Sequence, residues 1–277
     1  MTVKLTYLVD DYCSSAGLLG EHGLSVLLEA PGGTVLLDTG LGLALDFNAS
    51  ALGVDFADLD AVALTHGHND HTGGLKLVLE KAGKASMEVY AHPGVFTNRV
   101  KRNSSGALVS TGLPFKQAEL ESLGAHFVLN SEPVEVVPGI MLTGYIERGF
   151  EEIQTRAHFV SLDGDLVPDP FVDDQATVVE TEKGLCIVLG CAHAGVINTL
   201  NHVADITGEK EFYGLFGGTH LLQAGNEQLK QTLSEFQRRN IRLLCFSHCT
   251  GIGARAFFEK NFKGAYYQGI SGFSIEL

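Results

Sequence analysis

The segment His66–His71 has the sequence HGHNDH and places three imidazoles and one carboxylate within six positions. Neutral imidazole is the commonest metal ligand in proteins, and it binds Zn as well as Fe, Ni and Cu. The segment follows the apolar run 59–64, which is typical of a buried strand. Side chains on a loop after a strand are held by a rigid scaffold and stay open to solvent. The pattern therefore predicts an accessible metal site.

One cluster cannot complete two metal sites, so further ligands must come from elsewhere in the chain. Three histidines each follow an apolar run that predicts a strand. These are His193 after 185–189, His220 after 213–216, and His248 after 241–246. Because all three occupy the same position relative to a strand, we expect them to converge on the histidine cluster.

Several motifs together resemble one protein family, the metallo-β-lactamase superfamily. The pattern His-x-His-x-Asp-His of 66–71 is similar to its signature, and Asp38 in Leu-Leu-Asp-Thr-Gly is similar to its upstream Asp-Thr-Gly strand end. Motifs at 20–25, 190–195, 217–221 and 247–251 resemble the subgroup similar to the archaeal 7,8-dihydropterin-6-methyl-4-(ribofuranosyl)aminobenzene 5'-phosphate synthase. The resemblance covers nearly the whole chain.

The resemblance implies a centre with two divalent metal ions. We expect Zn, with Mn, Fe or Ni as alternatives, because nitrogen and oxygen ligands accept all four. Asp38 is expected to orient a ligating histidine rather than to bind metal itself. The implied ligands are His66, His68 and His193 for one ion, and Asp70, His71 and His248 for the other.

The chain departs from the superfamily at one ligand position. Many members place a bridging aspartate in a Gly-Asp turn after a strand, but Gly190-Cys191 and Gly217-Gly218 supply no carboxylate here. Three outcomes stay open: Cys191 ligates as a thiolate, His193 or His220 fills the gap, or one site is weak. The favoured interpretation is that Cys191 is a small buried residue.

Two neighbouring metal ions would hold a hydroxide at neutral pH and polarise a carbonyl or phosphoryl oxygen. We therefore expect a metal-dependent hydrolase of an ester, amide or phosphodiester-type bond, with Asp70, His220 and Asp38 as catalytic candidates. The subgroup implies an alternative, a dihydropterin-phosphate synthase-like transferase that displaces pyrophosphate. A di-iron redox protein or a non-catalytic binding protein is a further alternative, since fold does not fix function.

The expected partner is a small-molecule substrate, and basic residues would allow it to be phosphorylated. His22, in a glycine-rich turn, is a candidate for substrate binding, as are Arg102 and Arg148 for anions. Arg99 and Lys101 lie in the same basic stretch as Arg102. A solvated surface loop is the competing interpretation of that stretch.

Net charge, apolar runs and cysteine content exclude several classes of protein. A formal net charge of −14 argues against nucleic acid as a partner, because phosphate backbones require a positive footprint. No apolar run approaches the roughly 18 residues of a membrane span, and the N-terminus lacks the apolar region of a signal peptide. Five cysteines in 277 residues do not form a disulfide framework, so we expect a cytoplasmic protein. A homodimer is compatible with the sequence.

Val-, Ile- and Leu-rich strands interleaved with helices predict an α/β (α+β) fold. The resemblance implies an αββα four-layer sandwich. We expect a single domain over 1–277. Two segments, around 96–114 and 147–175, fit no regular element, and we interpret them as lid-like insertions over the substrate.

Overall fold

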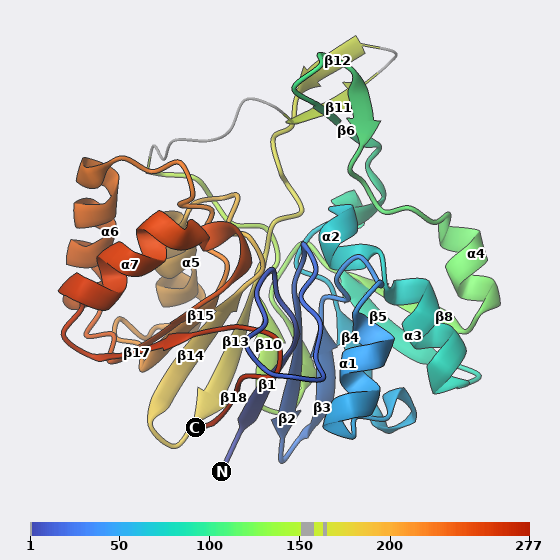
Figure 1. Cartoon of the computed structure of the whole chain (residues 1–277), viewed down its shortest axis with the longest axis horizontal. Helices are drawn as coiled ribbons and strands as arrows, with labels where there is room; N and C mark the ends of the chain where they lie inside the picture. The colour runs from blue at the N-terminus through green and yellow to red at the C-terminus, as the bar shows by residue number, and fades with distance from the viewer. Residues whose placement is uncertain (1, 151–157, 163–164) are drawn as a thin grey trace.

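The computed structural model describes residues 2–150, 158–162 and 165–277. Two seven-stranded sheets form its centre (Figure 1). The first sheet has the order β18 (Ser274–Glu276), β1 (Lys4–Val9), β2 (Ser25–Ala30), β3 (Gly33–Leu37), β4 (Ala61–Ala63), β5 (Met87–Ala91) and β8 (Ala125–Leu129). The second has the order β17 (Ala265–Gln268), β16 (Leu243–Phe246), β15 (Gly214–Gly217), β14 (Gly184–Leu189), β13 (Ala176–Thr181), β10 (Ile140–Leu142) and β9 (Val134–Val137).

Helices cover the outer face of each sheet, so the predicted αββα sandwich is confirmed (Figure 1). On the first sheet these are α1 (Leu45–Leu52) and α3 (Leu75–Ala82), with α4 (Gln117–Ser122) beside β8. On the second they are α5 (Val196–Thr207), α6 (Asn226–Arg238) and α7 (Gly251–Asn261).

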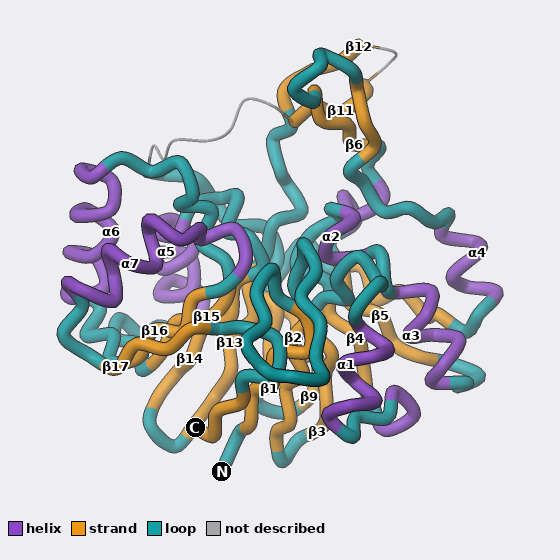
Figure 2. Tube along the Cα trace, in the orientation of Figure 1, coloured by secondary structure: helices purple, strands orange, loops and turns teal. Residues whose placement is uncertain are grey.

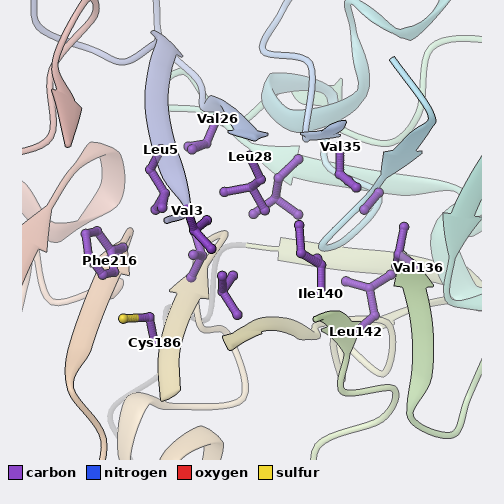
Figure 3. Close-up of a cluster of buried hydrophobic side chains, with 14 of the residues drawn as sticks. Val3, Leu5, Val26, Leu28, Val35, Val136, Ile140, Leu142, Cys186 and Phe216 are labelled. Atoms are coloured by element: carbon purple, nitrogen blue, oxygen red, sulfur yellow. The ribbon is translucent and has the colours of Figure 1, made fainter. Parts of the chain in front are cut away.

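Strand alternation explains why both faces of each sheet are apolar. On β2, Val26 and Leu28 pack into the core between the sheets (Figure 3). Leu27, between them, packs under α1 and α3. On β14, Val188 faces the other sheet, and Ile187 packs under the second helical layer. Successive side chains of a strand point to opposite faces, so a strand buried on both sides has a continuous apolar sequence.

A third, four-stranded sheet corrects the interpretation of the two insertions as irregular. It has the order β12 (Asp165–Pro168), β11 (His158–Leu162), β6 (Arg99–Arg102) and β7 (Leu108–Ser110), and it projects from the sandwich (Figure 2). Its central pairing joins segments remote in sequence, as in Phe159 opposite Val100. A short, largely exposed strand such as RVKR lacks the alternating apolar pattern that marks a half-buried strand. Positions 151–157 and 163–164 of the second insertion lie outside the described residues.

The strands predicted after 185, 213 and 241 agree with β14, β15 and β16 to within two residues. The apolar stretch 140–146 also predicts a strand, but β10 ends at Leu142. Gly144 follows with φ of +68°, a left-handed conformation that breaks an extended strand. Within the described ranges, no helix is long and apolar enough to cross a membrane.

The directions of the strands indicate which edge of the sandwich holds the functional site. Strands β3, β4 and β5 run parallel, as do β14, β15 and β16. The carboxyl ends of parallel strands meet at a common edge of the sheet. In Figure 1 this edge lies beneath the small third sheet and opposite the two chain termini.

Candidate metal centre

The histidine cluster begins where β4 ends, and its first two imidazoles meet His193 from the second sheet. His68 precedes the short helix α2 (Asn69–Thr72), whose single turn carries Asp70 and His71. One ring nitrogen from each of His66, His68 and His193 lies within 4.8 Å of the others. All three side chains are buried, with at most 5% of their surface exposed. The structure thus brings together the three ligands predicted for one ion.

The second predicted ligand set also converges. His71 Nε2 lies 3.3 Å from His248 Nε2, although the two residues are 177 positions apart in sequence. Asp70 Oδ2 lies 3.6 Å from the same His248 nitrogen. Donors from the histidine cluster therefore meet His248 Nε2 at the end of β16.

Carboxylates fix the opposite nitrogens of both histidines. Asp38 Oδ2 lies 2.7 Å from His71 Nδ1, and Asp11 Oδ1 lies 2.7 Å from His248 Nδ1. Asp38 is fully buried and also accepts hydrogen bonds from the backbone N–H and hydroxyl of Thr65. Such contacts set the imidazole tautomer and direct Nε2 towards a metal. Asp38 lies where the sequence analysis predicts it, whereas the sequence analysis misses Asp11.

Backbone strain is concentrated at this edge. Asp38, Ala192, His220 and His248 all have positive φ, between +46° and +56°. Residues other than glycine adopt this region at a cost, and such outliers cluster at functional sites. Gly190 faces a different constraint, because a Cβ there would lie 2.0 Å from Thr65 Oγ1. The loops that carry the donors therefore approach one another too closely for larger residues.

Burial keeps the first imidazole group neutral, which is the state that binds metal. Desolvation holds the pKa of His66, His68 and His193 well below the usual value. Burial alone would raise the pKa of Asp70, but the neighbouring imidazoles outweigh it and hold that pKa below its usual range. The group of His66, His68 and His193 thus offers neutral nitrogen donors at neutral pH, and Asp70 offers an ionised carboxylate. Burial alone would lower the pKa of His248, but Cys249, Asp11 and Asp70 raise it to about 10, so this imidazole must give up a proton to bind metal.

These residues fit a divalent metal. His66 Nε2 and His68 Nδ1 lie 3.0 Å apart, and both residues belong to the group that contains His193. Buried imidazoles whose ring nitrogens face one another leave room for a shared partner such as an ion. Imidazole nitrogens, carboxylate oxygens and a nearby thiol are the donors that Zn and similar metals accept.

Cys191 is buried, as expected, but it is not merely a small core residue. Its Sγ lies 3.2 Å from His71 Nε2. Cys249, which the sequence analysis leaves without a role, lies close by, and its Sγ accepts a hydrogen bond from the backbone N–H of His220. Burial raises the pKa of the Cys191 thiol well above its usual value.

A cavity of about 550 Å³ opens beside the histidines. His22 and His220 both line it, as predicted for residues that contact substrate. His22 Nδ1 lies 3.1 Å from Asp11, and its Nε2 lies 3.2 Å from Asp70. The contact with Asp11 raises the pKa of His22.

The small third sheet supplies one wall of this cavity. Lys101 and His158 pair across β6 and β11, and both line the cavity. The ring centroid of His158 is 5.0 Å from that of His68. Burial lowers the pKa of His158 to about 4. The sequence analysis misses His158, because its segment shows no signal of regular structure.

The cavity lining contains none of the three arginines named in the sequence analysis. Arg102 is exposed and donates to the Gly106 carbonyl, and Arg148 donates to the Phe171 carbonyl. Neither lines the cavity, so their substrate contacts stay predictions. Arg99 is buried between Asp169 and Asp173, at 2.8 and 2.5 Å. Its charge is therefore already compensated, and Lys101 is the basic residue of this stretch that reaches the cavity.

The fold and the histidine-rich edge define a class of protein, and comparison with known proteins identifies the family. The family model for the metallo-β-lactamase superfamily matches residues 19–248. The chain belongs to this superfamily. Its members generally bind divalent metals, and the donor groups described above are consistent with that property.

Individual relatives agree with this assignment. The chain is 31% identical over 271 residues to the 7,8-dihydropterin-6-methyl-4-(β-D-ribofuranosyl)-aminobenzene-5'-phosphate synthase of Methanocaldococcus jannaschii, covering 94% of this chain and 92% of the relative. The crystal structure of Tm1679, described as a metal-dependent hydrolase of the β-lactamase superfamily, superposes with a TM-score of 0.84 at 28% identity over 99% of both chains. The metallo-β-lactamase fold protein YhfI from Bacillus subtilis shares the fold, with a TM-score of 0.63 at 13% identity and full coverage of both chains.

Proposed function

We propose that this chain is a metal-dependent hydrolase that cleaves an ester, amide or phosphodiester-type bond in a small molecule. The observation that carries the proposal is the convergence of buried imidazoles from both sheets beside a cavity of about 550 Å³. His66, His68 and His193 would hold one ion, and Asp70, His71 and His248 the other. Bound divalent ions would supply a Lewis acid and an activated water at neutral pH.

The protein's own residues would orient the substrate and move protons. His22 and His220 line the cavity next to the donor groups, where they could contact substrate. His22 Nε2 lies against the Asp70 carboxylate, so this pair could pass a proton between the cavity and the centre. Asp38 and Asp11 would keep two imidazoles in the ligating orientation.

The test begins with protein purified without chelators. Metal analysis would be followed by a screen of generic esters, lactones and phosphodiesters. We expect hydrolysis that chelation removes and added Zn or Mn restores, and we expect His68→Ala to lose it. Hydrolysis that survives both complete chelation and His68→Ala would contradict the proposal.

A transferase that displaces pyrophosphate is the second candidate. It is supported by the near full-length similarity to the archaeal synthase and by the position of Lys101 in the cavity wall. Lys101 could neutralise a substrate phosphate. The assay would supply a pterin diphosphate with and without an aromatic ribose phosphate. Pyrophosphate release that requires the second substrate would favour the transferase over the hydrolase.

The pair Lys101 and Arg102 offers a matched test of phosphate binding, because only Lys101 lines the cavity. We expect Lys101→Ala to raise the KM for a phosphorylated substrate about tenfold, a loss of about 1.4 kcal/mol. Arg102→Ala should leave that KM unchanged. Equal effects of the two substitutions would show that phosphate is not bound at this wall.

We also propose a small-molecule substrate, without nucleic acid or a membrane as a partner, and a cytoplasmic location. The homodimer stays a prediction. The di-iron redox alternative has a simple test, because iron in the purified protein with a colour that bleaches on reduction would support it. Colourless zinc or manganese protein that hydrolyses substrate would contradict it.

A further inference from the structure

Cys191 lies at the centre of donor groups that span both halves of the metal centre. Its sulfur belongs to several groups whose donor atoms all lie within 4.8 Å of one another. The other members of three such groups are His66 and His71, then His248 and Cys249, and then His193 and His220. One sulfur atom is therefore close to imidazoles from four different strand ends.

The surroundings of Cys191 are those of a ligand rather than of a core residue. Its side chain is 3% exposed, and its Sγ lies 3.2 Å from His71 Nε2. Because Asp38 holds His71 Nδ1, the nitrogen that faces the sulfur is the one left to bind an ion. Cys186 and Cys245, in contrast, pack among apolar side chains between the two sheets.

A second contact places the other donor group beside the same sulfur. His66 Nε2 lies 3.0 Å from His68 Nδ1, so these two nitrogens face each other. His68 shares a donor group with His66 and His193, and each of these two also shares a group with Cys191. An ion held by His66 and His193 would therefore lie close to the Cys191 sulfur.

We propose that Cys191 is a metal ligand whose thiolate is shared between the two halves of the centre. Cys191 follows Gly190 in the turn where many superfamily members have a bridging aspartate. On ligation, the S–H bond breaks, the sulfur binds the metal and the proton passes to solvent. Thiolate ligands favour Zn and other softer ions over Mg or Mn, so this residue sets the metal preference. The inference requires metal binding but no particular reaction.

X-ray absorption at the zinc edge of the wild-type protein tests the proposal directly. A Zn–S distance of about 2.3 Å is distinct from Zn–N or Zn–O distances of about 2.0–2.2 Å. We expect a sulfur scatterer in the zinc coordination shell. A shell that fits nitrogen and oxygen alone would overturn the proposal, whatever the enzyme's activity proves to be.

Cysteine variants then identify which sulfur is bound. In the cobalt-substituted protein, a thiolate ligand gives an intense near-ultraviolet charge-transfer band. We expect Cys191→Ser to lose this band and to bind metal more weakly, whereas Cys249→Ser should retain it. Cys13→Ser is the control, because Cys13 lies outside the cavity lining and the donor groups. A band that survives in Cys191→Ser would contradict the assignment.

One further substitution separates ligation from packing. Cys191→Asp restores a carboxylate, so we expect it to recover metal content without the charge-transfer band and to raise the affinity for Mn relative to Zn. A merely structural cysteine would give no such exchange of metal preference, and an unchanged preference in a folded Cys191→Asp protein would count against the proposal. If both Cys191 variants fail to fold, the wild-type absorption measurement still decides.

Discussion

Single carboxylates determine how the imidazoles of the centre are presented. Asp38 is the clearest case, because it is fully buried and combines a 2.7 Å contact to His71 Nδ1 with two hydrogen bonds from Thr65. Its backbone adopts a φ of +56°, so the chain tolerates strain to place this group. Asp11 does the same for His248 from the other side of the cavity.

Replacing Asp38 therefore affects metal binding without removing a ligand. We expect Asp38→Asn to lower metal affinity about 10- to 100-fold, the usual effect of losing such an outer contact. Asp46→Asn is the control, since Asp46 forms only a partly exposed ion pair with Lys81. The measurement is competition for zinc against a chromophoric chelator. Unaltered affinity in folded Asp38→Asn protein would show that Asp38 does not orient the ligand.

Asp174 gives a second prediction for a single residue, on pH dependence. Burial raises the pKa of Asp174 to about 7, and its Oδ2 accepts a hydrogen bond from the Ala194 N–H. The folded pKa lies above the unfolded value, so the folded state retains a proton that the unfolded state has lost. The contribution of Asp174 to stability is therefore present at acid pH and is lost as pH rises through about 7.

We expect Asp174→Asn to gain stability relative to wild type as pH rises towards the folded pKa of about 7, by about 1 kcal/mol per pH unit, and the gain to level off above that pKa. Urea unfolding of the metal-free proteins between pH 5.5 and 8 measures this difference. The exposed Asp205 supplies the control variant, Asp205→Asn. A difference between wild type and Asp174→Asn that stays constant over this range would contradict the account.

Among the elements, the small third sheet depends on one buried ion-pair network. Arg99 on β6 bonds Asp169 and Asp173, which follow β12, and it donates to the Gly94 carbonyl. Asp173 in turn accepts a hydrogen bond from the backbone N–H of Gly67, between two predicted ligands. A Cβ on Gly67 would lie 2.6 Å from Arg99 Nη1, so the contact is too close for a larger residue. The network thus connects the cavity wall to the histidine loop.

Removing the cation of this network leaves two buried carboxylates without their partner. We expect Arg99→Met to reduce the free energy of unfolding by about 3–5 kcal/mol and to weaken metal binding through the Gly67 contact. Arg102→Ala on the same strand should change stability by no more than about 0.5 kcal/mol. Thermal and urea unfolding of both variants provide the comparison. Similar stabilities would mean that the network does not support the sheet.

Elements with a strong local pattern could be predicted from sequence, and those formed by remote pairing could not. The apolar run 59–64 predicts the strand that leads into His66, and the apolar spacing over 197–206 predicts a helix; β4 and α5 lie at these positions. Strands β6 and β11 join across some sixty residues, and Arg99 looks like a surface residue until its two carboxylate partners are known. The ligand histidines could be recognised by residue type and spacing. Asp11 and His158 could not, because only the structure shows that they contact His248 and His68.

The whole molecule brings the ends of parallel strands from two sheets to a single edge. The apolar core between the sheets holds that edge together, since Val26 and Leu28 from one sheet and Phe216 from the other pack there (Figure 3). His71 and His248 consequently meet although they lie on different sheets and 177 positions apart. A metal centre built this way couples ligand binding to the packing of both halves.

Metal stoichiometry of matched histidine variants tests the central claim, which is that imidazoles from both sheets bind shared ions. By elemental analysis, wild-type protein should hold two ions per chain, and His68→Ala and His248→Ala should each lose at least one. His126→Ala, exposed on β8, should retain both. Wild-type protein without bound metal, or unchanged metal content in both His68→Ala and His248→Ala, would contradict the account.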